Sequence, residues 1–316
     1  MESRALVPEL ILLSLGLHAP EGRSEAFPRG QSLLSPFDSA ERVPAEHSVL
    51  DVAQSRCSGC PGEAPLLWQL WSQNLIILRQ SKTVHYEAPF MYLVFGQSRA
   101  LLLDTGAEAD TPAFALRPTV ERLLRDHYGQ QREAIELVVA HSHGHSDHRG
   151  GDAEFLGQPG TRLIRSDEAV QCFGIKNWPT DIGSLDLGDR SLAVIPIPGH
   201  EGLDIAVYDA ASEILFAGDS LLPGRIYIRN WPLFRQSLDR LVDFLRDKPL
   251  TFILGAHIEL GLGGLEYPAG TLRQDKEVPL LLRKSDLLLL HARVKALEAQ
   301  PRREVHSNFI LVPVQG

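Results

Sequence analysis

One short segment, residues 140–151, concentrates side chains that bind metal ions. Within eight consecutive positions it carries His141, His143, His145, Asp147 and His148. Neutral imidazole is the commonest protein ligand for zinc, and a carboxylate can complete or bridge such a site. Histidines two positions apart at a strand end can project the same way, which suits His143 and His145 to one ion. Asp147 and His148 follow after the chain has turned, so this loop predicts ligands for a second ion as well.

Three further candidate ligands stand where apolar runs end. They are His200, Asp219 and His257, which follow the runs 194–199, 214–218 and 252–256. Loops gather at strand ends, so side chains at these places can meet the histidine-rich loop. A glycine lies next to each candidate or within two residues before it, which leaves backbone room for close approach to an ion.

The pattern His143-x-His145-x-Asp147-His148, completed by His200, Asp219 and His257, resembles the metallo-β-lactamase fold superfamily. The resemblance covers roughly residues 65–300, including the turn Asp104-Thr-Gly106. It implies an α/β (α+β) fold, an αββα sandwich with the metals at one edge of its two sheets. It also implies one ion held by His143, His145 and His200 and a second held by Asp147, His148 and His257. Asp219 would bridge two divalent ions, expected to be zinc, with iron or manganese as alternatives.

Such a centre predicts a hydrolase. Two divalent ions, two aspartates and a bridging hydroxide leave a net charge of about +1 in a partly dry site, which favours developing anions. Metal binding lowers the pKa of water from ~15.7 toward ~7 and so supplies hydroxide at neutral pH. We expect Asp147 to be catalytic, because it can orient the hydroxide and pass a proton to the leaving group. Tyr227 is a second catalytic candidate, since it could place a hydroxyl near a carbonyl oxygen.

The bridging Asp219 narrows the reaction. True β-lactamases of the superfamily generally lack this aspartate, so β-lactam hydrolysis is not expected. The ligand set is closer to glyoxalase II-type thioesterases and to lactonases, which implies hydrolysis of an ester, thioester or lactone in a small acyl substrate. Phosphodiester hydrolysis at the same centre and a non-catalytic metal-binding role are the alternatives. Residues 84–90, 221–228 and 259–268 are expected to contact the substrate, and Arg225 is either a substrate-facing cation or a surface arginine.

Apolar periodicity predicts the elements that position these residues. Strands are expected at 75–78, 91–95, 100–103, 135–140, 161–164, 251–254 and 308–312, with hairpins over 184–197 and 204–217. Helices are expected near 120–128, 167–173, 234–245 and 285–299. Both halves run strands first and helices after, which predicts two sheets packed face to face with helices outside. A motif that started at His141 would put His145 at the aspartate position and Ser146 at the next histidine position, so we interpret His141 as structural. We interpret Trp178 and Trp231 as packing residues.

The folded domain is expected over residues 65–316, behind a leader and linker over 1–64 that is rich in Pro, Gly and Ser. The leader contains the apolar run 10–17, which is either a cleaved export signal or an ordinary leader. The protein would be secreted or periplasmic in the first case and cytoplasmic in the second. Cys57 and Cys60 form either a disulfide or two inert thiols.

Composition excludes several classes of protein. Lys and Arg number 31 against 40 Asp and Glu, a net charge of −9, which disfavours nucleic acid as a partner because phosphate backbones are bound by basic surfaces. No run approaches the ~20 apolar residues of a membrane span. The chain lacks the GxSxG, HExxH, P-loop and GxGxxG motifs. The sequence leaves the oligomeric state and the natural substrate open.

Overall fold

The computed structural model describes residues 51, 56–109 and 114–314. The chain divides into the units Met1–Ala45 and Glu46–Gly316, and all the elements below belong to the second. The possible export signal over 10–17 lies outside the described residues. No helix among those described is long and apolar enough to cross a membrane.

The first sheet contains six strands in the order of the sequence. They are β2 (Leu66–Ser72), β3 (Leu75–Gln80), β4 (Phe90–Phe95), β5 (Arg99–Leu103), β6 (Glu136–Ala140) and β7 (Thr161–Leu163). Neighbours from β2 to β5 pair antiparallel, whereas β5, β6 and β7 pair in parallel. The parallel pairs are joined by α1 (Leu116–Tyr128), with a 3-10 turn over Gly129–Ala134, and by α2 (Asp152–Phe155). The predicted antiparallel run over 75–103 is therefore confirmed.

The second sheet has the order β13-β11-β10-β9-β8. Its strands are β8 (Gly183–Asp186), β9 (Ser191–Pro196), β10 (Ile205–Asp209), β11 (Ile214–Gly218) and β13 (Phe252–Gly255). Both predicted hairpins, β8–β9 and β10–β11, are present as antiparallel pairs. The helices of this half are α3 (Ala169–Cys172), α4 (Trp231–Leu245) and α5 (Lys284–Leu297). The strands β12 (Arg225–Ile228), β17 (Glu304–Val305) and β18 (Ile310–Pro313) form a small separate sheet.

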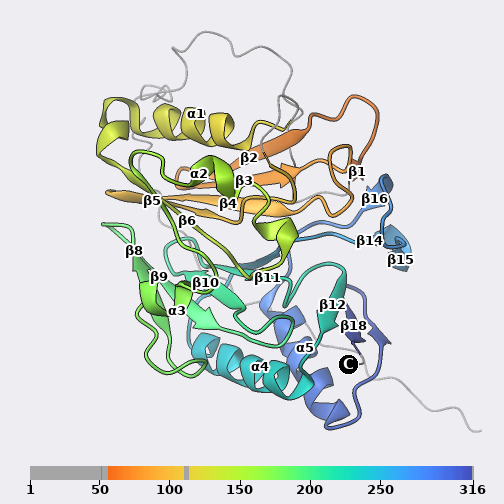
Figure 1. Cartoon of the computed structure of the whole chain (residues 1–316). Helices are drawn as coiled ribbons and strands as arrows, with labels where there is room; N and C mark the ends of the chain where they lie inside the picture. The colour runs from red at the N-terminus through yellow and green to blue at the C-terminus, as the bar shows by residue number, and fades with distance from the viewer. Residues whose placement is uncertain (1–50, 52–55, 110–113, 315–316) are drawn as a thin grey trace, which may run out of the picture. The chain divides into compact units, whose positions relative to one another are not determined.

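Alternation along the strands builds three apolar layers. In β3, Leu75 and Ile77 point into the core between the two sheets, while Ile76 and Leu78 pack with the residues of α1. A third cluster joins the other face of the second sheet to α4 and α5. Burying both faces of each sheet requires a helical layer on either side, and Figure 1 shows α1 outside one sheet and α4 and α5 outside the other. The fold is the predicted αββα sandwich.

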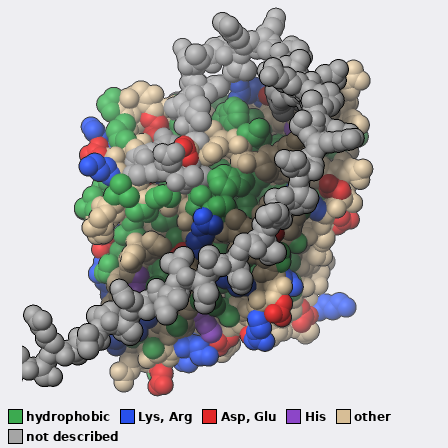
Figure 2. Space-filling view, turned by 180° about the vertical axis from the view of Figure 1, so that it is seen from behind, with side chains coloured by type: hydrophobic (Ala, Val, Ile, Leu, Met, Phe, Trp, Pro, Cys, Tyr) green, Lys and Arg blue, Asp and Glu red, His purple; other side chains and the backbone are tan. Residues whose placement is uncertain are grey.

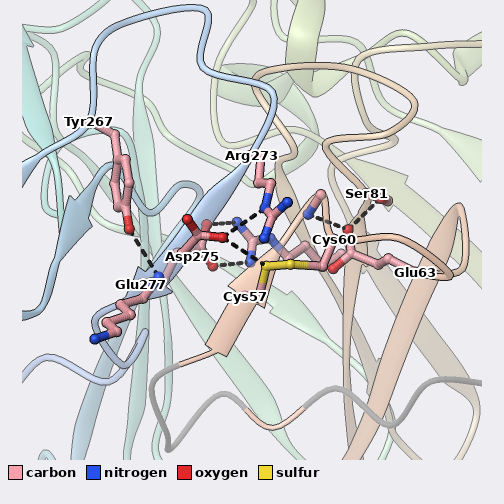
Figure 3. Close-up of a disulfide and its surroundings, with 11 residues drawn as sticks. Cys57, Cys60, Glu63, Ser81, Tyr267, Arg273, Asp275 and Glu277 are labelled. Atoms are coloured by element: carbon pink, nitrogen blue, oxygen red, sulfur yellow. Dashed lines mark hydrogen bonds and ion pairs between the residues drawn. A yellow bond between two sulfur atoms is a disulfide. The ribbon is translucent and has the colours of Figure 1, made fainter.

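Paired structure begins earlier than the expected boundary at Pro65. Strand β1 (Arg56–Ser58) pairs antiparallel with β16 (Gln274–Glu277) in a sheet completed by β14 (Leu260–Gly261) and β15 (Leu265–Glu266). Cys57 and Cys60 form a disulfide beside this pairing, as Figure 3 shows. Residues 56–58, inside the stretch interpreted as a linker, therefore belong to a paired strand. These strands are too short and polar to show an apolar period in the sequence.

A buried ion pair fastens this small sheet to the first one. Arg79, at the end of β3, donates two hydrogen bonds to Glu277 of β16, at 2.5 and 2.8 Å, and both side chains are 0% exposed. Nearby, the buried Lys82 donates to the backbone oxygen of Tyr86 at 2.7 Å. Burial, and then the charge of Arg79, lower the pKa of Lys82 to about 8.

Candidate metal centre

All seven predicted ligands follow strands of the two facing sheets. The loop after β6 carries His143, His145, Asp147 and His148, while His200, Asp219 and His257 follow β9, β11 and β13. One edge of the sandwich therefore collects side chains that are more than 110 positions apart in the sequence, between His143 and His257. Loops at the ends of buried strands are held by a rigid scaffold, which suits them to a site of defined geometry.

The first group of ligand atoms contains only histidine nitrogens. His145 Nδ1 lies 2.9 Å from His143 Nε2 and 3.0 Å from His200 Nε2. Nitrogens bound to one tetrahedral zinc ion at ~2.0–2.1 Å would stand about 3.3 Å apart, close to this spacing. His143 and His200 are buried and His145 is half-buried. The structure thus brings together the predicted first set.

The second group contains two histidines and two carboxylates. His148 Nε2 lies 3.4 Å from His257 Nε2, and Asp147 Oδ2 lies 3.4 and 3.3 Å from these two nitrogens. Asp219 Oδ1 stands 3.6 Å from the His148 nitrogen and 3.4 Å from that of His257. The predicted second set therefore meets around a separate point.

Asp219 faces both groups at once. Its Oδ1 is directed at His148 and His257, while its Oδ2 lies 3.5 Å from His200 Nε2 and 4.0 Å from His143 Nε2. Oδ1 is buried without a hydrogen-bond donor. A buried carboxylate oxygen that lacks a donor is costly, and a cation is the partner it would need. The position of Asp219 is that of a bridge between two sites.

For three of the histidines, a contact at Nδ1 fixes Nε2 as the nitrogen that faces the centre. His200 Nδ1 donates to the backbone oxygen of Tyr227 at 2.8 Å, and His257 Nδ1 donates to that of Glu87 at 3.0 Å. His148 Nδ1 lies 2.9 Å from Asp104 Oδ2. Such outer contacts orient imidazole rings in metal sites and leave Nε2 free to bind.

Asp104 is a site residue to which sequence reasoning gave no role beyond its turn. Its buried carboxylate accepts hydrogen bonds from the backbone nitrogen and hydroxyl of Ser142, at 2.7 and 2.9 Å, besides contacting His148. Asp104 has a positive φ of 69°, which suits a strand end that turns at once. A short polar residue between a buried strand and a glycine turn was the available signal.

Two glycines allow the close packing that was expected from the sequence. Gly218, before Asp219, has φ +51° and a Cβ there would lie 2.9 Å from Ser142 Cβ. A Cβ on Gly199, before His200, would lie 2.6 Å from Phe234 Cβ in α4. Larger residues at either position would move a candidate ligand.

Charges within the centre shift several pKa values. Burial, and then the charge of His148, lower the pKa of His143 well below its usual range. Burial disfavours the protonated form of His257, yet Asp219 and Asp147 outweigh it and raise the pKa to about 9. The pKa of Asp219 is lowered, because the neighbouring histidines overcome the effect of burial. Both carboxylates of the second group are thus held ionised, since the pKa of Asp147 is lowered in the same way by His148 and His257.

The structure places Tyr227 on β12 beside the first group. Its backbone oxygen holds His200, and its side chain is half-buried. Burial, and then Glu259, raise the pKa of the phenol, so it is protonated at neutral pH. Tyr86 belongs to the predicted contact loop 84–90. Its pKa is raised to about 12, mainly through Glu87, and the charges of Asp147 and Tyr227 act in the same direction.

Several other sequence interpretations are resolved by contacts. Arg225 is not a free cation, because its guanidinium pairs with Glu259 and, at 3.2 Å, with Glu266. Trp231 packs in the core against α5 and donates to the backbone oxygen of Glu298 at 2.7 Å. Trp178 packs at the edge of the core between the sheets. His141 Nε2 lies 3.1 Å from Asp152, outside both ligand groups, in agreement with a structural role.

A pocket of about 500 Å³ opens beside the first group. His145 and His200 form part of its wall, and Arg229, Glu201 and Gly202 lie around it. Burial, then His200 and then Arg229 lower the pKa of His145, so the arginine charge is close to that ring. The pocket gives the centre an open side.

The donor set fits two divalent metal ions. Imidazole nitrogens and carboxylate oxygens are the ligands that zinc, iron and manganese share in proteins. His145 Nδ1 lies within 3.0 Å of the Nε2 atoms of both His143 and His200, and the buried Asp219 Oδ1 lacks a donor among the described residues. A divalent ion in each group would satisfy these atoms.

Comparison with known proteins agrees with this geometry. The family described as "Metallo-beta-lactamase superfamily" matches residues 87–257, more than half of the chain and a range that contains every residue of both groups. The chain is similar to a hydroxyacylglutathione hydrolase of Hahella chejuensis, with 34% identity over 54% of this chain and 66% of that protein. It is also similar to the human acyl-coenzyme A thioesterase MBLAC2, with 29% identity over 43% of this chain and 59% of that protein.

The similarity to these relatives is partial in length. The chain spans 48% of a hydroxyacylglutathione hydrolase of Erythrobacter litoralis, at 29% identity. Among solved structures, it is similar to a metallo-beta-lactamase from Pontibacter korlensis, with 18% identity, a TM-score of 0.48 and coverage of 73% of this chain and 99% of that one. The mono-zinc form of the metallo-beta-lactamase FIM-1 from Pseudomonas aeruginosa gives 14% identity, a TM-score of 0.49 and coverage of 74% and 97%.

Proposed function

Because the chain belongs to the metallo-beta-lactamase superfamily, we propose that it is a metal-dependent hydrolase that cleaves the thioester, ester or lactone bond of a small acyl substrate. The observation that carries this proposal is the position of Asp219, whose two oxygens face two separate groups of ligand atoms. A shared carboxylate supports a binuclear hydrolytic centre and argues against β-lactams as the main substrate.

The proposed ligands are the seven predicted ones. His143, His145 and His200 would hold one ion, Asp147, His148 and His257 the other, and Asp219 both. We expect zinc, with iron or manganese as alternatives. When bound, two such ions lower the pKa of a water molecule and polarise the bond that it attacks.

Asp147 is the proposed proton carrier. Its side chain is 19% exposed, whereas those of His143 and His148 are 1% and 0% exposed, so Asp147 is the more accessible to solvent of these three candidate ligands. A carboxylate there can accept a hydrogen bond from the attacking water. The same carboxylate would then pass that proton to the leaving group.

Tyr227 is the proposed hydrogen-bond donor to the substrate. Its raised pKa keeps the phenol protonated, and a neutral O–H can donate to an oxygen that gains charge during the reaction. Its backbone oxygen already orients His200, so β12 would contribute both to holding a metal ligand and to contacting the substrate.

Thioesters are the first bond type to test. Two curated relatives carry names that specify thioester hydrolysis, on glutathione and coenzyme A respectively. A phosphodiester is the second candidate, because the same ions can polarise a phosphoryl oxygen. On the face drawn in Figure 2, basic and acidic side chains are interspersed, and the chain carries a net charge of −9, which ranks the phosphodiester lower.

The test is a substrate panel on the full chain reconstituted with zinc, manganese or iron. Thioesters, lactones, phosphodiesters and β-lactams would be compared by kcat/KM. We expect a thioester, ester or lactone to be turned over far better than the other two classes. Turnover of phosphodiesters alone would replace the main proposal with the second candidate. Stable binding of two ions without turnover of any class would support a non-catalytic metal-binding protein.

A further inference from the structure

The pocket beside the first ligand group contains a cation that the hydrolytic machinery does not use. Arg229 follows β12 directly, and its side chain is exposed on the pocket wall with His145 and His200. Among the residues that the structure describes, none forms an ion pair or hydrogen bond with its guanidinium. By contrast, Arg225, four positions earlier, pairs with Glu259 and Glu266.

The backbone of Arg229 is fixed with respect to the centre. Its N–H and that of Asn230 both donate to the backbone oxygen of Gly199, at 2.9 Å each. Gly199 precedes His200, so the arginine and a candidate metal ligand are tied to the same peptide. Asn230 in turn caps α4, since its side chain accepts a hydrogen bond from the N–H of Leu233 at 3.1 Å. The backbone that carries the Arg229 side chain is therefore held in place relative to His200.

The rest of the pocket leaves room for a ligand. A Cβ on Gly202 would meet nothing within 4 Å, and one on Gly144 would meet Ser166 only at 3.7 Å and beyond. The other charged side chain, Glu201, accepts a hydrogen bond from the N–H of Leu203 at 2.8 Å. An anion in this pocket would meet the unpaired arginine on one side and the metal-binding edge on the other.

We propose that Arg229 is a specificity-determining residue that binds an anionic oxygen group, a carboxylate or a phosphate, on the substrate. The inference rests on the proposed hydrolase function and adds the substrate class to it. A guanidinium presents a fork of donors that matches two oxygens of such a group. Arg229 contacts the substrate away from the bond that breaks, so it acts mainly on KM.

The test uses matched acetyl thioesters that differ only in the leaving thiol. One thiol carries a carboxylate (3-mercaptopropionate), one a phosphate (2-mercaptoethyl phosphate) and one a neutral group (the N-methyl amide of the first). A second pair, a glutaryl thioester and its N-methyl amide, places the charge on the acyl side. The metal-loaded full chain, Arg229→Gln, Arg229→Lys and the exposed control Arg246→Gln would be compared.

We expect Arg229→Gln to raise KM for at least one charged substrate about tenfold or more, with kcat within about twofold. The neutral substrates and the control should change less than about twofold, and Arg229→Lys should restore part of the charge preference. Which charged substrate responds distinguishes carboxylate from phosphate, and acyl side from leaving group. An equal change for charged and neutral substrates, or no change for any, would overturn the inference and leave the proposed function standing.

A readout that needs no turnover separates the two proposals. Calorimetric titration of the metal-loaded protein with glutarate mono-N-methyl amide and with 2-hydroxyethyl phosphate measures anion binding directly. Binding to the wild type that Arg229→Gln weakens would support the inference even if no thioester is cleaved, in which case only the proposed function fails. Equal binding by both proteins, with no charge preference in turnover, would overturn the role of Arg229.

Discussion

Two buried clusters of charged and polar side chains lie in this domain, and they are satisfied in opposite ways. Arg79 and Glu277 meet as a bidentate pair at 2.5 and 2.8 Å, so each charge has its partner within the protein. In the metal centre, like atoms face one another, with His145 Nδ1 at 2.9 Å from His143 Nε2, and Asp219 Oδ1 has no donor within the part of the chain that the structure describes.

The difference separates a structural cluster from a ligand site. A buried polar group that finds its complement stabilises the fold, whereas one left without it costs free energy unless something outside the chain binds there. The metal centre is arranged for an added cation, and the ion pair is arranged to need nothing more. Removing a charge should therefore affect function in the metal centre and stability at the Arg79–Glu277 pair.

The largest expected effect comes from Asp147→Asn. The carboxylate is the proposed proton carrier, so its loss should lower kcat by about 10² to 10⁴. Steady-state kinetics on the reconstituted variant would measure this, with the exposed Asp243→Asn as a control. Unchanged turnover would contradict the assigned role.

Glu277→Gln should show the opposite pattern. It leaves Arg79 buried without its counter-charge, and such losses cost about 3–5 kcal/mol of unfolding free energy. Glu136→Gln is a matched control, because Glu136 pairs with Arg99 at 2.9 Å where the two side chains are 38% and 42% exposed, and exposed pairs contribute only ~0–1 kcal/mol. Urea unfolding would compare them. Equal losses in both variants would mean that burial does not set the value of the pair.

Lys82 gives the structural cluster a pH signature. Its pKa is lowered to about 8 in the folded chain from the ordinary lysine value of 10.5, so between these values the unfolded chain binds more protons than the native one. Stability therefore rises with pH across this window, by about 3 kcal/mol for a shift of this size. The difference in unfolding free energy between the wild type and Lys82→Met should change by that amount from pH 7.5 to 10.5, in favour of the wild type. A difference that does not vary with pH would contradict burial of the charged amine.

Asp104→Asn should produce the smallest effect of the series. The carboxylate orients His148 at 2.9 Å, and loss of such an outer partner weakens metal binding about 10- to 100-fold. Competition with a zinc chelator would measure the affinity. Asp189→Asn, in an exposed turn where the carboxylate accepts the N–H of Gln97, is the control. Affinities equal to the wild type in both variants would show that Asp104 does not position the ring.

The sequence was sufficient to predict the principal strands, and the candidate ligands that the structure brings together, for one physical reason. Strands such as β3 and β11 bury both faces, which leaves continuous apolar runs, and the candidate ligands stand where those runs end. Residue type and position therefore coincide at His143, Asp219 and His257. Their meeting in space follows from the packing of the two sheets.

Contacts between distant polar residues could not be read in the same way. Arg79 and Glu277 are 198 positions apart, and in the sequence each resembles an ordinary surface charge. The strand β16, with the sequence QDKE, has no apolar alternation and forms only against β1 and β14. Arg225 likewise looked available for substrate until its partners Glu259 and Glu266 were placed beside it.

The most direct test of the account is the number of metal ions that the chain holds. Metal-depleted full-length protein would be titrated with zinc and its content measured by mass spectrometry after removal of free ion. We expect two equivalents per chain, for the wild type and for folded Glu277→Gln alike, because the two proposed ligand groups meet at Asp219 and Glu277 belongs to neither. One equivalent or none in the wild type would contradict a centre built for a pair of ions.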